Sequence, residues 1–155
     1  MSAEDAVRNY KALSQVERAF RSLKTIDLHV RPIHHRAADR VRSHIFLCML
    51  AYYVAWHMRE AWRPLLFADE DQQAKATRDP VAPSRRSDAA DHKAATHQLA
   101  DGTAVHSFRT LLHDLSSIVR NRCRTRGHED APTFTVTTTP TSAQRRALDL
   151  LKRIA

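Results

Sequence analysis

The chain is 155 residues long and 43% hydrophobic, which is enough for one ordinary domain with a core. It holds only 2 glycines, and this scarcity argues against a turn-rich all-β fold because tight hairpins need residues that tolerate positive φ. The net charge is +8 with histidine neutral, and such a field attracts polyanions, nucleic acid first and anionic membrane second; a basic surface with no such partner is the alternative.

The sequence carries no sign of export or of a membrane anchor. The segment MSAEDAVRNY at the start lacks the apolar stretch of a signal peptide, and Cys48 and Cys123 form no disulfide framework. The longest apolar run, residues 45–56, is too short to span a bilayer and fits a buried core helix. We therefore expect a cytoplasmic protein with no membrane partner.

Two helices are predicted in the first part of the chain. Residues 3–24 carry apolar side chains at helical spacing, and Ser2 can cap the start of this helix. Residues 25–36 contain Pro32, which interrupts a helix, so they are predicted to form an extended connector. Residues 37–62 form the second predicted helix. Its centre is apolar on all sides, so it should be buried on most sides and needs more covering surface than the rest of the chain obviously supplies.

The middle of the chain differs in composition from both ends. Residues 68–102 are rich in polar side chains and contain two prolines, which predicts a mobile linker or surface arm. A short helix is possible over residues 88–100. The chain is thereby divided into residues 1–67, the linker, and residues 103–155.

The last part combines helices with one strand. Residues 103–122 are predicted to form an amphipathic helix, with arginines between residues 120 and 126 at its end. Such arginines are usually a solvated helix end, and contact with nucleic-acid phosphates is the alternative. Residues 133–138 alternate between apolar residues and threonines, which predicts one short strand. A capping box at Thr141 and Gln144 begins the last helix. The fold expected is mainly α with one short β-strand.

Three polar residues of the first helix are spaced by seven. Tyr10, Glu17 and Lys24 therefore fall along one stripe, with about 10 Å of helix axis between Glu17 and Lys24. The carboxylate could bind a divalent metal and the amine a phosphate, so the stripe could contact a nucleic-acid strand across an active centre. The plainer interpretation is an ion pair of Glu17 with Arg21 on a solvated helix face.

The segment YKALSQVERAFRSLKTIDLHVRPIHHR resembles the region around the last catalytic acid of insertion-sequence transposases of the DDE class. The pattern of that family is Tyr-x2-Arg-x3-Glu-x6-Lys, and Tyr10, Glu17 and Lys24 match it at the right spacings. Leu13 stands at the arginine position, as in one branch of the family, and the following HIFLCMLAYYVAWHMREAW is similar to that branch. The stretches RDPVAP, VHSFRTLLHDLSSIVRN and TTTPTSAQRRALDLL resemble its C-terminal tail, so the resemblance covers nearly the whole chain.

The resemblance implies a role for each matched residue. Glu17 would be the third acid of the catalytic triad and would help to bind Mg²⁺ in the two-metal chemistry of the complete enzyme. Tyr10 and Lys24 would contact the transposon end near the scissile phosphate. Arg18 or Arg21 would take over the DNA contact of the missing arginine.

The same resemblance implies an architecture. The chain would be the C-terminal portion of an RNase H-like α/β catalytic domain, in which residues 1–67 are the helical end of the core, residues 68–102 a mobile arm and residues 103–155 a helical tail with one short strand. The first two acids of that fold lie on strands before this helix, and only 16 residues precede Glu17. We therefore expect a transposase fragment that is not catalytic alone and does not bind Mg²⁺ tightly. Its partners would be DNA at transposon ends and the missing N-terminal part or a full-length transposase.

Two other functions stay open. The chain could be a stand-alone basic helical protein that binds DNA or the full-length transposase and inhibits it. It could also be an unrelated helical interaction domain that binds no DNA. Competition with an intact transposase would favour the regulator.

Overall fold

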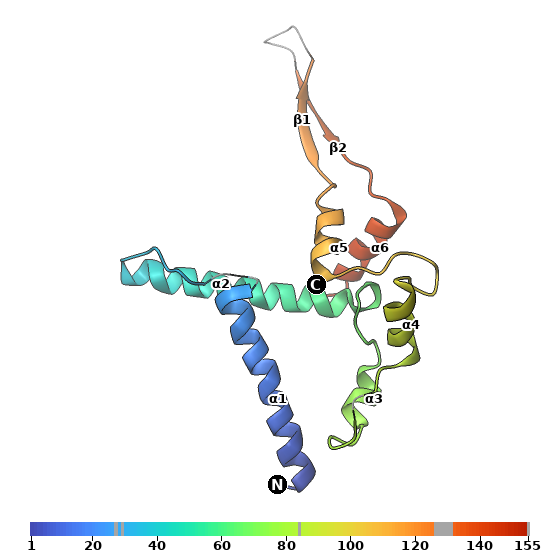
Figure 1. Cartoon of the computed structure of the whole chain (residues 1–155). Coiled ribbons are helices and arrows are strands. Elements are labelled where there is room, and N and C mark those ends of the chain that lie inside the picture. The colour runs from blue at the N-terminus through green and yellow to red at the C-terminus, as the bar shows by residue number, and fades with distance from the viewer. Residues whose placement is uncertain (27, 29, 84, 126–131, 155) are drawn as a thin grey trace. The chain divides into compact units, whose positions relative to one another are not determined.

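The computed structural model describes residues 1–26, 28, 30–83, 85–125 and 132–154. The chain is mainly helical and contains a two-stranded antiparallel sheet (Figure 1). It divides into two compact units: Met1–Glu60 with Asp71–Ser87, and Ala61–Glu70 with Asp88–Ala155. In the part of the chain that the structure describes, no helix has both the length and the apolar character needed to cross a membrane.

The first unit is built from helices. It contains α1 (Ala3–Arg21), the π-helical turn η1 (Ser22–Ile26), nearly all of α2 (Ala38–Ala61), and α3 (Gln72–Thr77). The bounds of α1 and α2 agree with the predicted helices to within a few residues. Ser2 caps α1 as predicted, since its hydroxyl accepts a hydrogen bond from the Asp5 N–H at 3.1 Å.

The first unit exposes its apolar side chains. Of its described residues only Ser22 is buried, and α2 has no buried residue. Phe46 and Tyr53 of α2 are 63% and 61% exposed, and Leu13 of α1 is 60% exposed. The prediction that the second helix is buried on most sides is therefore wrong for this chain. The reason is that the chain supplies too little apolar surface to cover a helix whose centre is apolar on all sides.

The second unit holds the apolar core. It contains the 3₁₀ turn η2 (Arg63–Leu65), α4 (Asp88–Thr96), α5 (Phe108–Leu115), β1 (Arg120–Arg124), β2 (Thr133–Thr137) and α6 (Ser142–Leu151). All the buried apolar residues of the described chain lie in this unit: Trp62, Leu65, Leu66, Leu99, Val105, Leu111 and Ala147. Trp62 is completely buried, and its indole N–H donates to the Ala147 carbonyl at 2.8 Å.

The segment from residue 88 to residue 106 packs onto this core, since Lys93, Leu99 and Val105 are buried. Lys93 of α4 is buried and forms an ion pair with Glu70. A tight loop follows, in which the Leu99 N–H donates to the Thr103 carbonyl at 2.8 Å and Gly102 takes a φ of 79°, a conformation that glycine adopts without strain. Whether residues 68–102 move as an arm, as their composition predicts, stays a prediction.

The predicted helix over residues 103–122 is too long at both ends. α5 begins only after Ser107, whose hydroxyl accepts from the Thr110 N–H at 3.1 Å and so caps the helix. It ends at Leu115 because the next two serines bond to carbonyls of the last turn: the Ser116 hydroxyl to His113 at 2.6 Å and the Ser117 hydroxyl to Asp114 at 2.8 Å. The residues that follow are free to extend and form β1.

Gln144 holds the start of α6 against the end of α5. Its side-chain oxygen accepts from the Thr141 N–H at 3.0 Å, which completes the predicted capping box. Its amide nitrogen donates to the Asp114 carbonyl and to the Ser117 hydroxyl, both at 2.9 Å. Gln144 is buried, so these bonds hold the end of α5 next to the start of α6. The hairpin of β1 and β2 connects these two helix ends.

We expect Gln144→Ala to destabilise the second unit. The substitution removes three hydrogen bonds of a buried side chain, to the Asp114 carbonyl, the Ser117 hydroxyl and the Thr141 N–H, which costs about 1–3 kcal/mol of unfolding free energy. Urea denaturation followed by circular dichroism measures this loss. The exposed neighbour gives the control, because Arg145→Ala should change stability by less than about 0.5 kcal/mol. Equal effects of the two substitutions would contradict the role assigned to Gln144.

We also expect the isolated chain to bind a hydrophobic dye through α2. Phe46, Leu50 and Tyr53 recur at helical spacing and are all exposed, so replacing the three by glutamine should lower dye fluorescence. Phe134→Gln, an exposed aromatic residue outside α2, is the control and should change the fluorescence little. A cooperative monomer that binds no dye would show that the apolar face of α2 is covered in solution.

Candidate nucleic-acid interface

The hairpin of β1 and β2 presents two chemically different faces. The strands pair antiparallel from Arg120 opposite Thr137 to Arg124 opposite Thr133. Since successive side chains of a strand point to opposite faces and directly paired residues share a face, one face is polar and basic. We call it the arginine–threonine face, and it consists of Arg120, Arg122, Arg124, Thr133, Thr135 and Thr137.

The arginine–threonine face is exposed and carries positive charge. All six of its residues are exposed. The guanidinium of Arg122 is held across the strands, because its Nε donates to the Thr133 hydroxyl at 3.1 Å. The two strands contain three arginines and no aspartate or glutamate, and the sequence between them contains Arg126, Glu129 and Asp130.

The opposite face of the hairpin is largely apolar. It carries Cys123 opposite Phe134 and Asn121 opposite Val136. Phe134 and Val136 are 54% and 49% exposed, and Cys123 is half-buried. The segregation of arginines to one face is therefore a property of the strand register. A slip of one residue would exchange the two faces.

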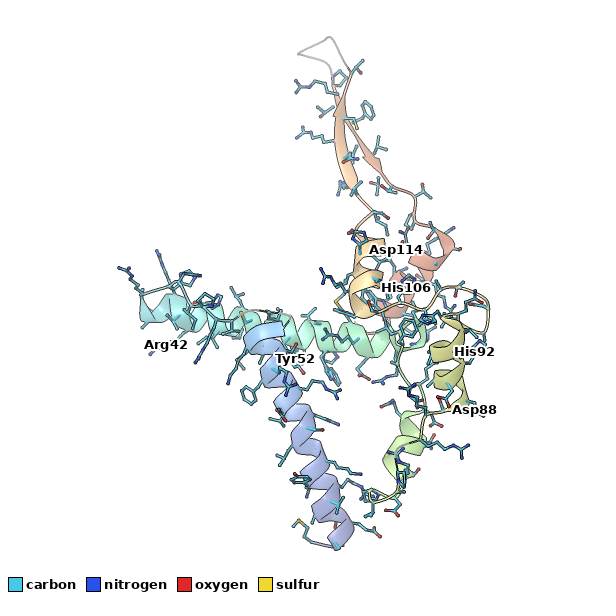
Figure 2. All side chains as sticks on the ribbon, in the orientation of Figure 1. Arg42, Tyr52, Asp88, His92, His106 and Asp114 are labelled. Atoms are coloured by element: carbon cyan, nitrogen blue, oxygen red, sulfur yellow. The ribbon has the colours of Figure 1, made fainter. Side chains whose placement is uncertain are left out.

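The base of the hairpin is tied to the helices of its own unit. Thr138 closes the ladder by donating its N–H to the Val119 carbonyl at 2.9 Å, and the Val119 N–H donates to the Thr138 hydroxyl at 3.3 Å. Asp114, labelled in Figure 2, lies in the last full turn of α5, where its carbonyl meets Gln144 of α6. The strands run out from α5 and α6, and their side chains stand clear of both helices (Figure 2). A two-stranded ribbon alone is marginally stable in water, so these ties are what orient the arginines.

This arrangement has the chemistry of a polyanion-binding surface. A guanidinium remains charged at any physiological pH and presents a planar set of donors that matches phosphate oxygens and the edges of bases. Threonine hydroxyls add donors and acceptors of the kind found at DNA backbones. The ionisable side chains of this face are all guanidinium groups.

The residues predicted from the resemblance lie on α1 and η1 of the first unit. Tyr10 is 76% exposed, and Glu17 accepts a hydrogen bond from Arg21 Nη2 at 2.7 Å. Arg18 is exposed on the same helix. The α-helix is regular from Ala3 to Arg21, so Tyr10 and Glu17 share a face, as predicted. The Glu17–Arg21 pair is the plainer alternative that the spacing also allowed.

Lys24 departs from the predicted stripe. It lies in η1, whose π-helical turn is wider than an α-helical one, so a seven-residue step from Glu17 no longer returns to the same face. Its Nζ lies 5.8 Å from the centre of the Phe20 ring, a cation–π distance. The structure thus places Lys24 near the stripe's end but out of line with Glu17.

Glu17 contributes one carboxylate to any metal site. Over the residues that the structure describes, no group of three or more His, Cys, Asp or Glu side chains is placed to hold a metal ion. A hard divalent cation needs several oxygen ligands, so further ligands would have to come from elsewhere. The role of Glu17 in binding Mg²⁺ stays a prediction.

The second unit also has a depression of about 630 Å³. Its charged rim residues are already paired with one another: Lys93 with Glu70, and Arg146 Nη1 with Asp101 at 2.5 Å. The hydroxyl and N–H of Thr103, with Arg146, hold the pKa of Asp101 below its usual value. The charged side chains that line the depression therefore neutralise one another in pairs.

The predicted helix over residues 103–122 hides the arginine–threonine face, because it places these arginines at a helix end. Two signals could have found it. The segment RNRCR alternates with a period of two, and the predicted strand at residues 133–138 needs a partner to satisfy its backbone N–H and C=O groups. The arginines were noted as possible phosphate contacts, but their common face follows only from the strand.

Comparison of the chain with protein-family models, with curated protein sequences and with solved structures gave no match.

Proposed function

We propose that this chain binds DNA through the arginine–threonine face of its hairpin, as a DNA-binding part of a DDE-type transposase. The observation that carries the proposal is the register of β1 and β2, which places Arg120, Arg122 and Arg124 on one exposed face. Such a face neutralises phosphates and releases their counterions, which drives binding to nucleic acid.

The charge of the rest of the chain supports the same proposal. The net charge is +8, so the long-range field attracts a polyanion toward the hairpin. Arginine is the residue suited to this task because its donors form a rigid fork, whereas lysine offers a point charge. The described hairpin contains arginine and no lysine.

The transposase part of the proposal comes from the resemblance around Tyr10, Glu17 and Lys24. The exposed faces of α1 and α2 are compatible with it. Leu13 of α1 and Phe46 of α2 are both exposed, and such apolar faces suit packing against a catalytic core supplied by another segment. In that setting this chain supplies one acid and the DNA-binding hairpin. Strand cleavage and transfer belong to the complete enzyme.

A regulator is the second candidate, and the same exposed apolar faces favour it. A chain that binds transposon ends and docks on an intact transposase would inhibit that enzyme. Two experiments separate the candidates. Dose-dependent inhibition when this chain is added to an intact transposase supports the regulator. Activity that appears when this chain is mixed with the N-terminal part of such a transposase supports the fragment.

Replacing the three hairpin arginines by glutamine should weaken DNA binding and its salt dependence together. Each phosphate contact contributes about 0.9 to the slope of log K against log salt, so Arg120→Gln, Arg122→Gln and Arg124→Gln combined should lower the magnitude of the slope by about 2.7. Fluorescence anisotropy with a labelled duplex at several salt concentrations measures this slope.

A second triple variant with the same net charge is the control. Arg36→Gln, Arg40→Gln and Arg86→Gln remove three exposed arginines outside the hairpin. The proposal requires a clearly smaller change of slope in this control. Equal slopes in the two triple variants would mean that binding depends on total charge and not on the hairpin.

Glu17→Gln tests the catalytic part of the proposal. When the helix of residues 3–26 replaces its counterpart in an intact transposase of this class, the substitution should abolish metal-dependent cleavage, because a carboxylate ligand is lost. Binding to transposon ends should remain. Cleavage that survives the substitution would show that Glu17 serves only as the ion-pair partner of Arg21.

A further inference from the structure

We propose that the arginine–threonine face enters the major groove of B-form DNA and contacts guanines that lie one or two base pairs apart. This inference rests on the proposed DNA-binding function and adds the form of nucleic acid, the groove and the base. Its first support is a match of spacings. An antiparallel strand rises about 3.4 Å per residue, so alternate residues lie about 6.8 Å apart. Base pairs are about 3.4 Å apart along the duplex axis, and a ribbon that follows the groove is inclined to that axis, so each step from Arg120 to Arg122 to Arg124 advances by about one to two base pairs.

The width of the hairpin selects the groove. Two paired strands lie about 4.8 Å apart before side chains are added. The major groove of B-form DNA is about 12 Å wide and accepts a two-stranded ribbon, whereas the minor groove is about 6 Å wide. The major groove of A-form RNA is deep and narrow, so side chains cannot reach its bases. The ribbon therefore fits double-stranded DNA.

The side chains select the base. Arginine donates two hydrogen bonds to O6 and N7 of guanine, which is the commonest specific contact in this groove. Arg122 is already held through Nε by the Thr133 hydroxyl, so its two terminal nitrogens are the pair that can meet a guanine. The threonines opposite the arginines offer methyl groups for thymine and hydroxyls for other base edges.

The order of the two faces supports the same orientation. Cys123, Phe134 and Val136 lie on the face away from the arginines, so only polar side chains would be presented to the floor of the groove. The backbone N–H groups on the outer edges of a two-stranded ribbon stay available for the phosphates that flank the groove. The ribbon can thereby hold its position and contact bases at once.

The first experiment selects duplexes bound by the full chain from a random pool. The inference predicts guanines one or two base pairs apart within about five base pairs, on either strand. Replacing each selected guanine by 7-deazaguanine, which removes the N7 acceptor, should weaken binding about tenfold per position. The same sequence as RNA duplex or as single-stranded DNA should bind at least about tenfold more weakly.

Arg120→Lys, Arg122→Lys and Arg124→Lys combined provide the matched variant. This chain keeps its charge, so its salt slope should match that of the unaltered chain, while its preference for the selected guanines should fall about tenfold. Salt-dependent duplex binding without a selected cluster of guanines, or without an effect of 7-deazaguanine, would overturn the inference and leave the proposed function intact. Absence of salt-dependent binding to any nucleic acid would overturn both.

Discussion

The buried indole of Trp62 is the contact on which the second unit depends. It is the side chain that joins the turn after α2 to α6, through its hydrogen bond to the Ala147 carbonyl and its ring contact with Phe108 at 5.7 Å. A buried indole needs apolar contacts for its ring and an acceptor for its N–H. Trp62 finds the ring contact on α5 and the acceptor on α6, and so holds these two helices together. The hairpin leaves α5 and returns to α6, so the orientation of its arginines follows from this packing.

Much of the fold could be predicted from the sequence, because the signals were local. The helices over residues 3–24 and 37–62 and the capping box at Thr141 follow from spacing and from cap residues, and the structure confirms them. The end of α5 could not be predicted, because apolar periodicity continues through Ile118 and Val119. The helix stops because the Ser116 and Ser117 hydroxyls bond to carbonyls of its last turn. The Asp114 carbonyl also accepts from the side chain of Gln144, a residue 30 positions away.

The candidate site shows the same division. The positions of Tyr10 and Glu17 on one helix face could be predicted from a regular helix, and the loss of register at Lys24 could not, because a π-helical turn has no simple sequence signal. The face formed by Arg120, Arg122 and Arg124 depends on strand pairing. Pairing is a contact between two segments, so the periodicity of either segment alone does not predict it.

The most direct test of the account observes the arginine side chains while DNA binds. In a ¹H–¹⁵N spectrum of the full chain, a duplex added at low salt should shift the Nε–H signals of Arg120, Arg122 and Arg124. The signals of Arg145 and Arg153 on and after α6 should stay in place. Saturating DNA that leaves the hairpin signals unchanged and moves those of Arg8, Arg18 or Arg21 would contradict the central claim and place the DNA-binding surface on α1 instead.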